Sequence, residues 1–458
     1  MTLTPPFYYR LPVTLQNAAV SLYGLWRERR RFGSDFEKKL ALVCERAATD
    51  HESMIAYRDN RLAVFVRHAA KTTPYYRELF RKNGIDPNEI RTISDLSRLP
   101  ILDKNFVARN RDQFISEAID PNKVIWARTS GTTGGGLVFP VTLSAHQEQW
   151  ATWWRYRSWH GIDRSIWHAT FTERSIAPAD QTKPPFWRMD YVGRQIFFSP
   201  HHISEENIRH YIDHLNRVKP RWLTGRPSLI SELASYMNRT GHGLDYQLEW
   251  ITLGAENLLA HQRHQIQRAF GITPVQHYGM EEGVANISEH PDHTLRIDED
   301  FAAVELVPSD MPGLCKVVGT NFSNPAFPLL RYDVGDLVSA DELPARSGAF
   351  RRIIRTLDGR TDDFVVLRDG RKAIGLNNLF APFTDIASAQ ITQTEPGEVT
   401  ICLVKGSGFS SETETKLRQA AAAHLGADTR IDVKYVDTLV KTSNGKVRLV
   451  ISSAGRIY

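Results

Sequence analysis

Cysteine is scarce in this sequence, with only Cys44, Cys315 and Cys402 among 458 residues. The three lie far apart and match no zinc-binding spacing, which excludes a zinc ribbon or a disulfide-stapled miniprotein. A small and odd count of cysteines is typical of proteins in a reducing compartment. We therefore expect a cytoplasmic protein.

Long apolar runs are also missing from the sequence. No stretch approaches the roughly 20 apolar residues of a transmembrane helix, so we expect no membrane span. The first 16 residues carry Pro5, Pro6 and Pro12, and they lack the basic start and apolar stretch of a signal peptide. We therefore expect no secretion signal in this segment.

Neither sign of charge dominates, since 57 lysines and arginines against 52 aspartates and glutamates give a net charge of +5. The densest basic run, residues 27–31, contains a glutamate and is interpreted as a solvated helix face. A nucleic-acid-binding protein needs a clustered basic patch, so we expect no nucleic-acid partner. The slight positive balance would suit an anionic substrate.

The spacing of apolar residues predicts an α/β fold. Residues 1–95 have mainly helical spacing, and the middle third alternates between the two element types. There we predict helices over 204–218, 227–240 and 260–270 and a buried strand over 249–253.

From about residue 301 the pattern becomes strand-rich, and a polar cluster at 358–363 predicts a domain boundary. Beyond it a strand at 399–404, a helix at 412–425 and a strand at 431–435 predict a small α+β unit. We predict a large N-terminal domain (1–361) with mixed β-sheets flanked by helices. A small mobile domain (362–458) follows.

The segment with the clearest chemical signature is Thr129–Gly136, which reads TSGTTGGG. Glycine lets a backbone approach an anion closely, and hydroxyls with successive N–H groups can surround phosphate oxygens. No Lys-Ser/Thr pair follows the glycines, which excludes a P-loop. A Gly-rich hairpin is the structural alternative, but four hydroxyls in six residues favour phosphate contact.

Further polar motifs follow in order. They are Gly254–Glu256, His277–Gly283, Arg331–Asp336, Gly359–Asp363 and Lys441–Lys446. Each alone could be a polar turn. Together, from Thr129 to Lys446, they resemble the adenylate-forming superfamily of acyl-CoA synthetases, luciferases and peptide-synthetase adenylation domains.

Two shorter stretches narrow the resemblance. Leu99–Lys104 resembles the phenylacetate–CoA ligase branch, and Gly445–Arg448 resembles capsule-biosynthesis relatives of that ligase. The resemblance implies ATP, Mg²⁺ and CoA as cofactors and a small carboxylic acid as substrate. The carboxylate would attack the α-phosphorus of ATP, releasing pyrophosphate, and the CoA thiol would then displace AMP from the acyl-adenylate. Such an enzyme is an AMP-forming acid–thiol ligase.

The resemblance also implies roles for individual residues. The β- and γ-phosphates would contact Ser130, Gly131, Thr132, Thr133 and Gly134. The adenine would lie against Gly254, Ala255 and Glu256, with Tyr278 and Gly279 beside it. Glu282 would hold magnesium, Asp336 would accept hydrogen bonds from the ribose hydroxyls, and Arg360 would make a second ribose or phosphate contact. Asp362 would lie at the hinge, and Lys446 would bridge the carboxylate and the α-phosphate. The acid pocket would be lined by Thr224 and Gly225.

Two positions depart from the family pattern. Gly135 stands where the phosphate loop often has lysine, and Glu281 stands where Thr or Ser usually donates to the α-phosphate. A glutamate there would repel the phosphate unless it binds metal, is protonated or turns away. Either Glu281 or Glu282 could therefore hold the magnesium.

Several alternatives stay open at this stage. The acceptor could be an amine or a carrier-protein thiol, and the chain could be a non-catalytic nucleotide-binding homologue. The aromatic residues from Trp150 to Trp159 could be core or acid pocket, with core favoured. The pairs His261/His264 and His290/His293 are interpreted as surface residues rather than metal ligands. The acid and the oligomeric state, including a homodimer, stay open.

Overall fold

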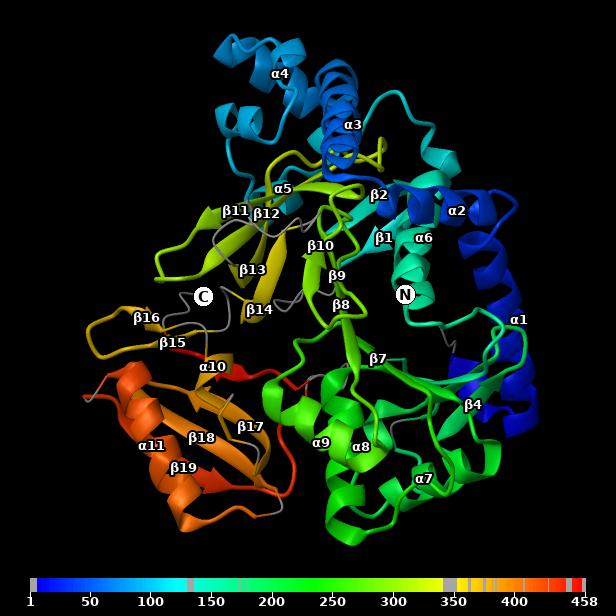
Figure 1. Cartoon of the computed structure of the whole chain (residues 1–458), viewed down its shortest axis with the longest axis vertical. Helices are drawn as coiled ribbons and strands as arrows, with labels where there is room; N and C mark the ends of the chain where they lie inside the picture. Colours follow the sequence, from blue (N-terminus) through cyan, green and yellow to red (C-terminus); the bar gives the residue numbers. More distant parts are fainter. Residues whose placement is uncertain are drawn as a thin grey trace. The chain divides into compact units, whose positions relative to one another are not determined.

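A computed structural model describes the chain within residues 6–454, with short gaps. The described ranges are 6–129, 136–172, 174–178, 180–340, 352–360, 364–373, 376–380, 382–383, 385–406, 408–426, 428–441 and 447–454. They form a mixed α/β fold, as predicted, in two compact units of discontinuous sequence (Figure 1). The first unit comprises Met1–Trp26, Asp163–Gln276 and Asp358–Tyr458, and the second comprises Arg27–Ile162 and His277–Leu357.

The second unit combines helices with an antiparallel sheet. Its helices are α2 (Phe36–Ala47), α3 (His51–Thr72), α4 (Pro74–Asn83), α5 (Lys104–Arg109) and α6 (Leu143–Trp159), and α1 (Val13–Arg31) enters from the first unit. The strands run in the order β11 (Ala302–Pro308), β12 (Cys315–Asn321), β13 (Tyr332–Ala340), β14 (Ile353–Arg360), β10 (Leu295–Ile297), β9 (Asn286–Glu289) and β8 (Val275–Gly279). One apolar core joins this sheet to α3, α4 and α5.

Local sequence signals set the ends of these helices. The Asp50 side chain accepts a hydrogen bond from the backbone N–H of Ser53 and so caps α3. Helix α4 begins at Pro74, whose missing N–H costs nothing there, and it ends at Asn83, where Gly84 caps it in the left-handed conformation.

The first unit contains a mostly parallel sheet. Its strands run in the order β7 (Trp250–Gly254), β6 (Trp222–Gly225), β3 (His168–Phe171), β5 (Gln195–Phe198) and β4 (Trp187–Asp190), with only β4 antiparallel among them. The helices α7 (Ile208–Val218), α8 (Pro227–Thr240) and α9 (Ala260–Phe270) share its apolar core. Carboxyl ends of parallel strands form the usual ligand-binding edge of such a sheet.

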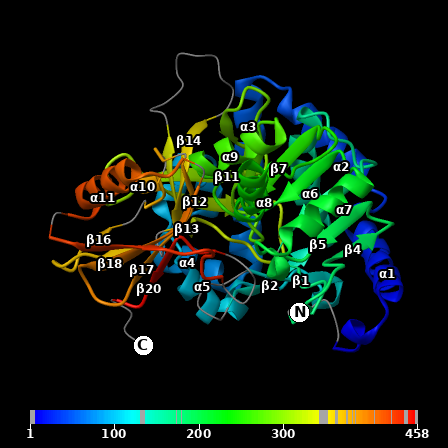
Figure 2. The same cartoon turned by 90° about the horizontal axis from the view of Figure 1, so that it is seen from below.

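The small C-terminal domain has its own sheet and core. The strands run in the order β19 (Arg430–Tyr435), β18 (Glu398–Lys405), β17 (Ile386–Gln393) and β20 (Val450–Ser452). Helix α11 (Ser411–Leu425) lies along one side of this sheet in both views (Figures 1 and 2), and Leu417, Ala421 and Leu425 join the core. The short elements β15 (Val365–Val366), β16 (Lys372–Ala373) and α10 (Asn377–Phe380) precede it.

Most predicted elements are present. The helices expected at 227–240 and 260–270 are α8 and α9, residue for residue. The helix expected from residue 204 begins only at Ile208, because residues 204–207 form a turn in which Ser204 O accepts from the N–H of Asn207. Residues 361–363 lie outside the described ranges, so the boundary at 361/362 stays a prediction.

The hairpin β1 (Val124–Arg128) and β2 (Val138–Thr142) frames the glycine-rich loop. The strands pair antiparallel from Val124↔Thr142 to Arg128↔Val138, and the N–H of Thr129 donates to Leu137 O at 3.0 Å. The flanks therefore form the hairpin that the sequence allowed.

In the ranges that the structure describes, no helix has the length and apolar character of a membrane span.

Candidate functional site

Two predicted site residues meet in the second unit. Tyr278 lies on β8 and Asp336 on β13, and the Tyr278 hydroxyl donates to Asp336 Oδ2 at 2.7 Å. Both side chains are half-buried. The sequence alone allowed Asp336 to sit in a polar turn, but it lies within a strand, which gives its carboxylate a fixed direction. An ionised carboxylate is an acceptor only and is therefore suited to the hydroxyls of a ribose.

Glu282 is buried and held by neighbouring groups. Its Oε1 accepts from the Tyr332 hydroxyl at 3.3 Å and lies 3.7 Å from Lys104 Nζ. Its backbone carbonyl accepts from Asn321 Nδ2 at 3.3 Å. Sequence reasoning missed Lys104 as a partner, although it ends the Leu99–Lys104 stretch that carried part of the resemblance.

The residues present fit a magnesium ion bound together with a phosphate. Glu281 and Glu282 offer hard carboxylate oxygens, and no group of three or more His, Cys, Asp or Glu with metal-binding geometry occurs in the part of the chain that the structure describes. Mg²⁺ commonly binds through one or two carboxylates and takes its other ligands from substrate phosphates and water. The donor set matches that mode and does not match a cage made of protein alone.

Glu281 has a different environment from Glu282. Its side chain is exposed, yet the surrounding protein partly desolvates it, which raises the pKa of its carboxyl. The charge of Glu282 also raises this pKa, whereas Arg31 and Arg30 lower it. The two arginines at the end of α1 therefore partly offset the repulsion expected between the Glu281 carboxylate and a phosphate.

These arginines correct one expectation. Residues 27–31 were predicted to be a solvated face, but Arg27 is buried and Arg30 and Arg31 are half-buried. The Arg31 guanidinium lies 3.7 Å from the centre of the Trp150 ring, a cation–π arrangement. Charge spacing along one helix cannot reveal such a partner, because Trp150 comes from α6.

The predicted adenine wall lies in the first unit. Gly254 ends β7, and Ala255 has φ +64, a left-handed conformation that turns the chain sharply. Glu256 Oε2 accepts from the N–H of Ser228 at 3.3 Å, and Glu256 Oε1 lies 3.8 Å from Arg226 Nη1. The Glu256 carboxylate thus serves the N-terminus of α8, which favours negative charge.

The predicted acid-pocket residues lie at the end of β6 in the same unit. Thr224 Oγ1 accepts from Thr252 Oγ1 at 2.9 Å. A methyl group on Gly225 would lie 2.2 Å from the backbone oxygen of Phe171. Glycine is therefore required here by the close approach of β6 to β3, whatever ligand binds beside it.

The aromatic run of α6 is buried in part, with two of its five members in the interior. Trp154 and Tyr156 are buried, while Trp153 is half-buried and its Nε1 donates to Asn286 Oδ1 at 3.0 Å. A methyl group on Gly279 would come within 3.2 Å of that Trp153 nitrogen. One member of the run thus packs directly against the Tyr278–Gly279 motif.

Several predicted residues cannot be placed. Ser130, Gly131, Thr132, Thr133, Gly134, Asp362 and Lys446 lie outside the described residues. The backbone of Arg360 lies in β14, but its side chain is not described. Their roles stay predictions.

Among the histidine pairs, His261 contradicts the expected surface position. It is 1% exposed, and neither ring nitrogen has a hydrogen-bond partner among the described residues. Burial lowers its pKa to about 4, so the ring is neutral at physiological pH. A buried histidine of this kind is a packing residue.

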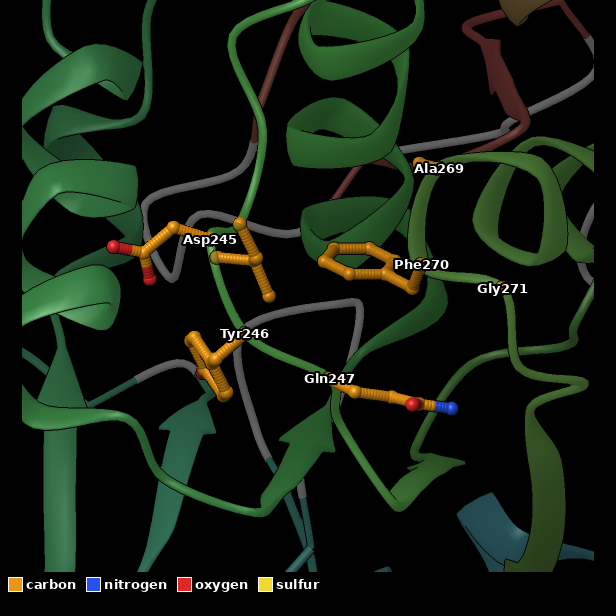
Figure 3. Close-up of a pocket in the computed structure, with 7 residues that line it drawn as sticks. Asp245, Tyr246, Gln247, Ala269, Phe270 and Gly271 are labelled. Carbon is orange, nitrogen blue, oxygen red and sulfur yellow. The ribbon is translucent and has the colours of Figure 1, made fainter.

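A surface hollow of about 570 Å³ lies elsewhere in the first unit (Figure 3). It is lined by Leu244, Asp245, Tyr246, Gln247, Ala269, Phe270 and Gly271. None of the predicted site residues lines it, so it adds nothing to the candidate site.

The fold matches that of a solved CoA ligase. A solved structure of 2-hydroxyisobutyryl-CoA ligase, in the postadenylation state with R3-HIB-AMP, superposes with a TM-score of 0.63 at 16% identity. The match covers 86% of this chain and 89% of that one. The chain therefore has the fold of the adenylate-forming CoA ligases.

Sequence comparisons give particular relatives. The chain is 26% identical over 454 residues to Protein CapK of Staphylococcus aureus, covering 97% of this chain and 98% of CapK. It is 25% identical over 343 residues to phenylacetate-coenzyme A ligase of Thermus thermophilus, covering 69% and 72%. The CapK C-terminal domain family model matches residues 367–453. The chain is thus a homologue of CapK and the phenylacetate–CoA ligases, which confirms the resemblance to this branch of the adenylate-forming superfamily.

Proposed function

We propose that this protein activates a carboxylic acid with ATP as an acyl-adenylate and then transfers the acyl group to CoA. The observation that carries the proposal is the hydrogen bond between Tyr278 and Asp336, with Glu281 and Glu282 three and four residues after Tyr278 in the sequence. Within one unit, Tyr278 would stack on the base, Asp336 would accept from the ribose, and the two glutamates would offer carboxylates to a metal. The names of the phenylacetate–CoA ligase relatives support the same reaction class.

The reaction requires two anions to be held together. Asp336 would accept hydrogen bonds from the ribose hydroxyls, and Glu282 would hold Mg²⁺ through an oxygen already oriented by Tyr332 and Lys104. The metal would supply positive charge to the phosphates. Lys446 would neutralise the incoming carboxylate and the charge that grows on the α-phosphate, a preorganised form of transition-state stabilisation.

The acid pocket is proposed at the end of β6, with Thr224 and Gly225. Ser130, Thr132 and Thr133 of the glycine-rich loop would hold the β- and γ-phosphates. The backbone of Gly254 and Ala255 would form the adenine wall, because the Glu256 carboxylate is engaged at α8. Three free cysteines suit a reducing compartment, and we propose the cytoplasm as the location.

The test is pyrophosphate release over a panel of carboxylic acids, with and without CoA, followed by mass spectrometry of the products. We expect at least one acid to give both pyrophosphate and a CoA thioester. Pyrophosphate and acyl-AMP without a thioester would indicate an amine or carrier-protein acceptor. ATP binding by calorimetry without pyrophosphate for any acid would support a non-catalytic homologue and overturn the proposal.

A further inference from the structure

Two stems, residues 440–441 and 447–448, flank residues that lie outside the described ranges, and they are held to each other and to the small-domain sheet. Lys441 and Val447 form an antiparallel bridge. Gln390 of β17, 1% exposed, donates through Nε2 to Val440 O at 3.0 Å and to Arg448 O at 2.9 Å, and its Oε1 accepts from the N–H of Val440 at 3.2 Å. One buried amide therefore holds both stems.

The same stem is also tied to helix α8 of the first unit. Lys441 Nζ lies 3.0 Å from Glu232 Oε1 and 3.1 Å from Glu232 Oε2. Both side chains are largely shielded, with 21% and 29% exposed. Burial lowers the pKa of His201, and the charge of Lys441 lowers it further, so Lys441 lies near groups from two elements of this unit.

Because the Lys441–Glu232 pair is largely shielded from solvent, loss of one partner should cost more free energy than at an exposed pair. Desolvation raises the pKa of Glu232, the charge of Glu256 adds to this, and Lys441 opposes both. Removing the lysine would leave a partly buried carboxylate without its cation, which costs more than breaking an exposed pair. A second contact also joins the small domain to the helices of this unit, because Gln265 Nε2 of α9 donates to Ile386 O of β17 at 3.1 Å.

Gln390 and Glu232, which hold this stem, belong to different parts of the structure. Gln390 belongs to the small-domain sheet and would travel with it. Glu232 belongs to α8, where the neighbouring Leu233 is part of the core of the parallel sheet. A turn of the small domain would therefore preserve the Gln390 bonds and break the Lys441–Glu232 pair.

We propose that Lys441 is a positioning residue whose ion pair with Glu232 holds the small domain in one of the two arrangements required by the half-reactions. The inference rests on the proposed function. It adds a pair that sets the balance between adenylation and acyl transfer without touching the reacting atoms. Loss of the pair shifts that balance in one direction, whichever partner is removed.

The test compares Lys441→Met, Glu232→Gln and the exchanged double variant Lys441→Glu/Glu232→Lys. Lys416→Met is the matched control, because Lys416 pairs with Glu412 at the exposed surface of the same domain. The readout is the ratio of acid-dependent pyrophosphate release to thioester formation from supplied acyl-adenylate and CoA. Thermal melting followed by circular dichroism verifies that each variant is folded.

Both single variants should change this ratio in the same direction by about threefold to tenfold, a usual range for coupled charged neighbours. The exchanged variant should return it to within about twofold of the wild type, and the control should leave it unchanged. An active wild type whose ratio is unaffected in the single variants overturns the inference, as do opposite shifts or no rescue by exchange. A wild type that releases no pyrophosphate with any acid overturns the proposed function itself, so the two failures are distinguishable.

Discussion

The Tyr278 hydroxyl donates to the Asp336 carboxylate across 2.7 Å, although 58 positions separate them in the sequence. The contact joins β8 to β13 and brings together the residues expected at the base and at the ribose. If a nucleotide binds there, the carboxylate is shared between Tyr278 and the ribose hydroxyls.

Replacing Asp336 should therefore weaken ATP binding. Asp336→Ala removes charge-assisted hydrogen bonds and should cost roughly 1.5–3 kcal/mol of binding free energy. Tyr278→Phe keeps the aromatic face and the carboxylate, so it should cost less. Isothermal titration calorimetry of both folded variants checks this order, and unchanged affinity in Asp336→Ala contradicts the ribose assignment.

The two adjacent glutamates should respond differently to loss of charge. Glu282 is buried against Lys104 and Tyr332, whereas Glu281 is exposed near Arg30 and Arg31. Glu282→Gln should therefore raise the magnesium concentration needed for half-maximal activity more than Glu281→Gln does.

Magnesium titrations of pyrophosphate release measure this difference. The reverse order would place the metal at Glu281. Glu281→Thr restores the donor usual in the family and should leave activity intact or improve it. A loss of activity in Glu281→Thr would mean that this glutamate has a role of its own.

Lys446→Ala should separate the half-reactions. Loss of one preorganised electrostatic partner typically costs about 10²–10³ in rate, so acid-dependent pyrophosphate release should fall at least about a hundredfold. Conversion of a supplied acyl-adenylate should stay near wild type. Asp362→Pro should have the opposite bias, because a stiffened hinge hinders domain rotation more than the first chemical step. Equal damage to both steps by both substitutions would argue against a two-conformation mechanism.

His261 should make the protein sensitive to acid. Burial lowers its pKa from 6.5 to about 4, so the unfolded chain binds a proton that the folded chain does not between these pH values. The free energy of unfolding should therefore fall as the pH drops from about 6.5 to 4. His261 alone should contribute about 3 kcal/mol to that fall.

Urea unfolding of His261→Leu at several pH values measures this contribution. The variant should lose less stability than the wild type across the window, and the exposed neighbour variant His264→Leu should behave like the wild type. Parallel pH profiles for the wild type and His261→Leu would show that the ring is not protonated on unfolding. His214 and His277 also have a pKa near 4, so some acid sensitivity should persist.

The amino-acid sequence by itself determined the local features of this protein. Apolar periodicity with Pro227 and Gly241 at its ends placed α8, and the ordered polar motifs identified the superfamily. These signals act within a few residues and need no tertiary context. Only the tertiary structure decided which distant groups meet, because sheet order and helix packing are absent from a linear pattern. Thus Lys104 lies near Glu282, and the charges of Arg30 and Arg31 act on Glu281. Lys441 pairs with Glu232, 209 positions away in the sequence. The burial of His261 was also decided by the tertiary structure, because a helix position becomes buried only when another element covers it.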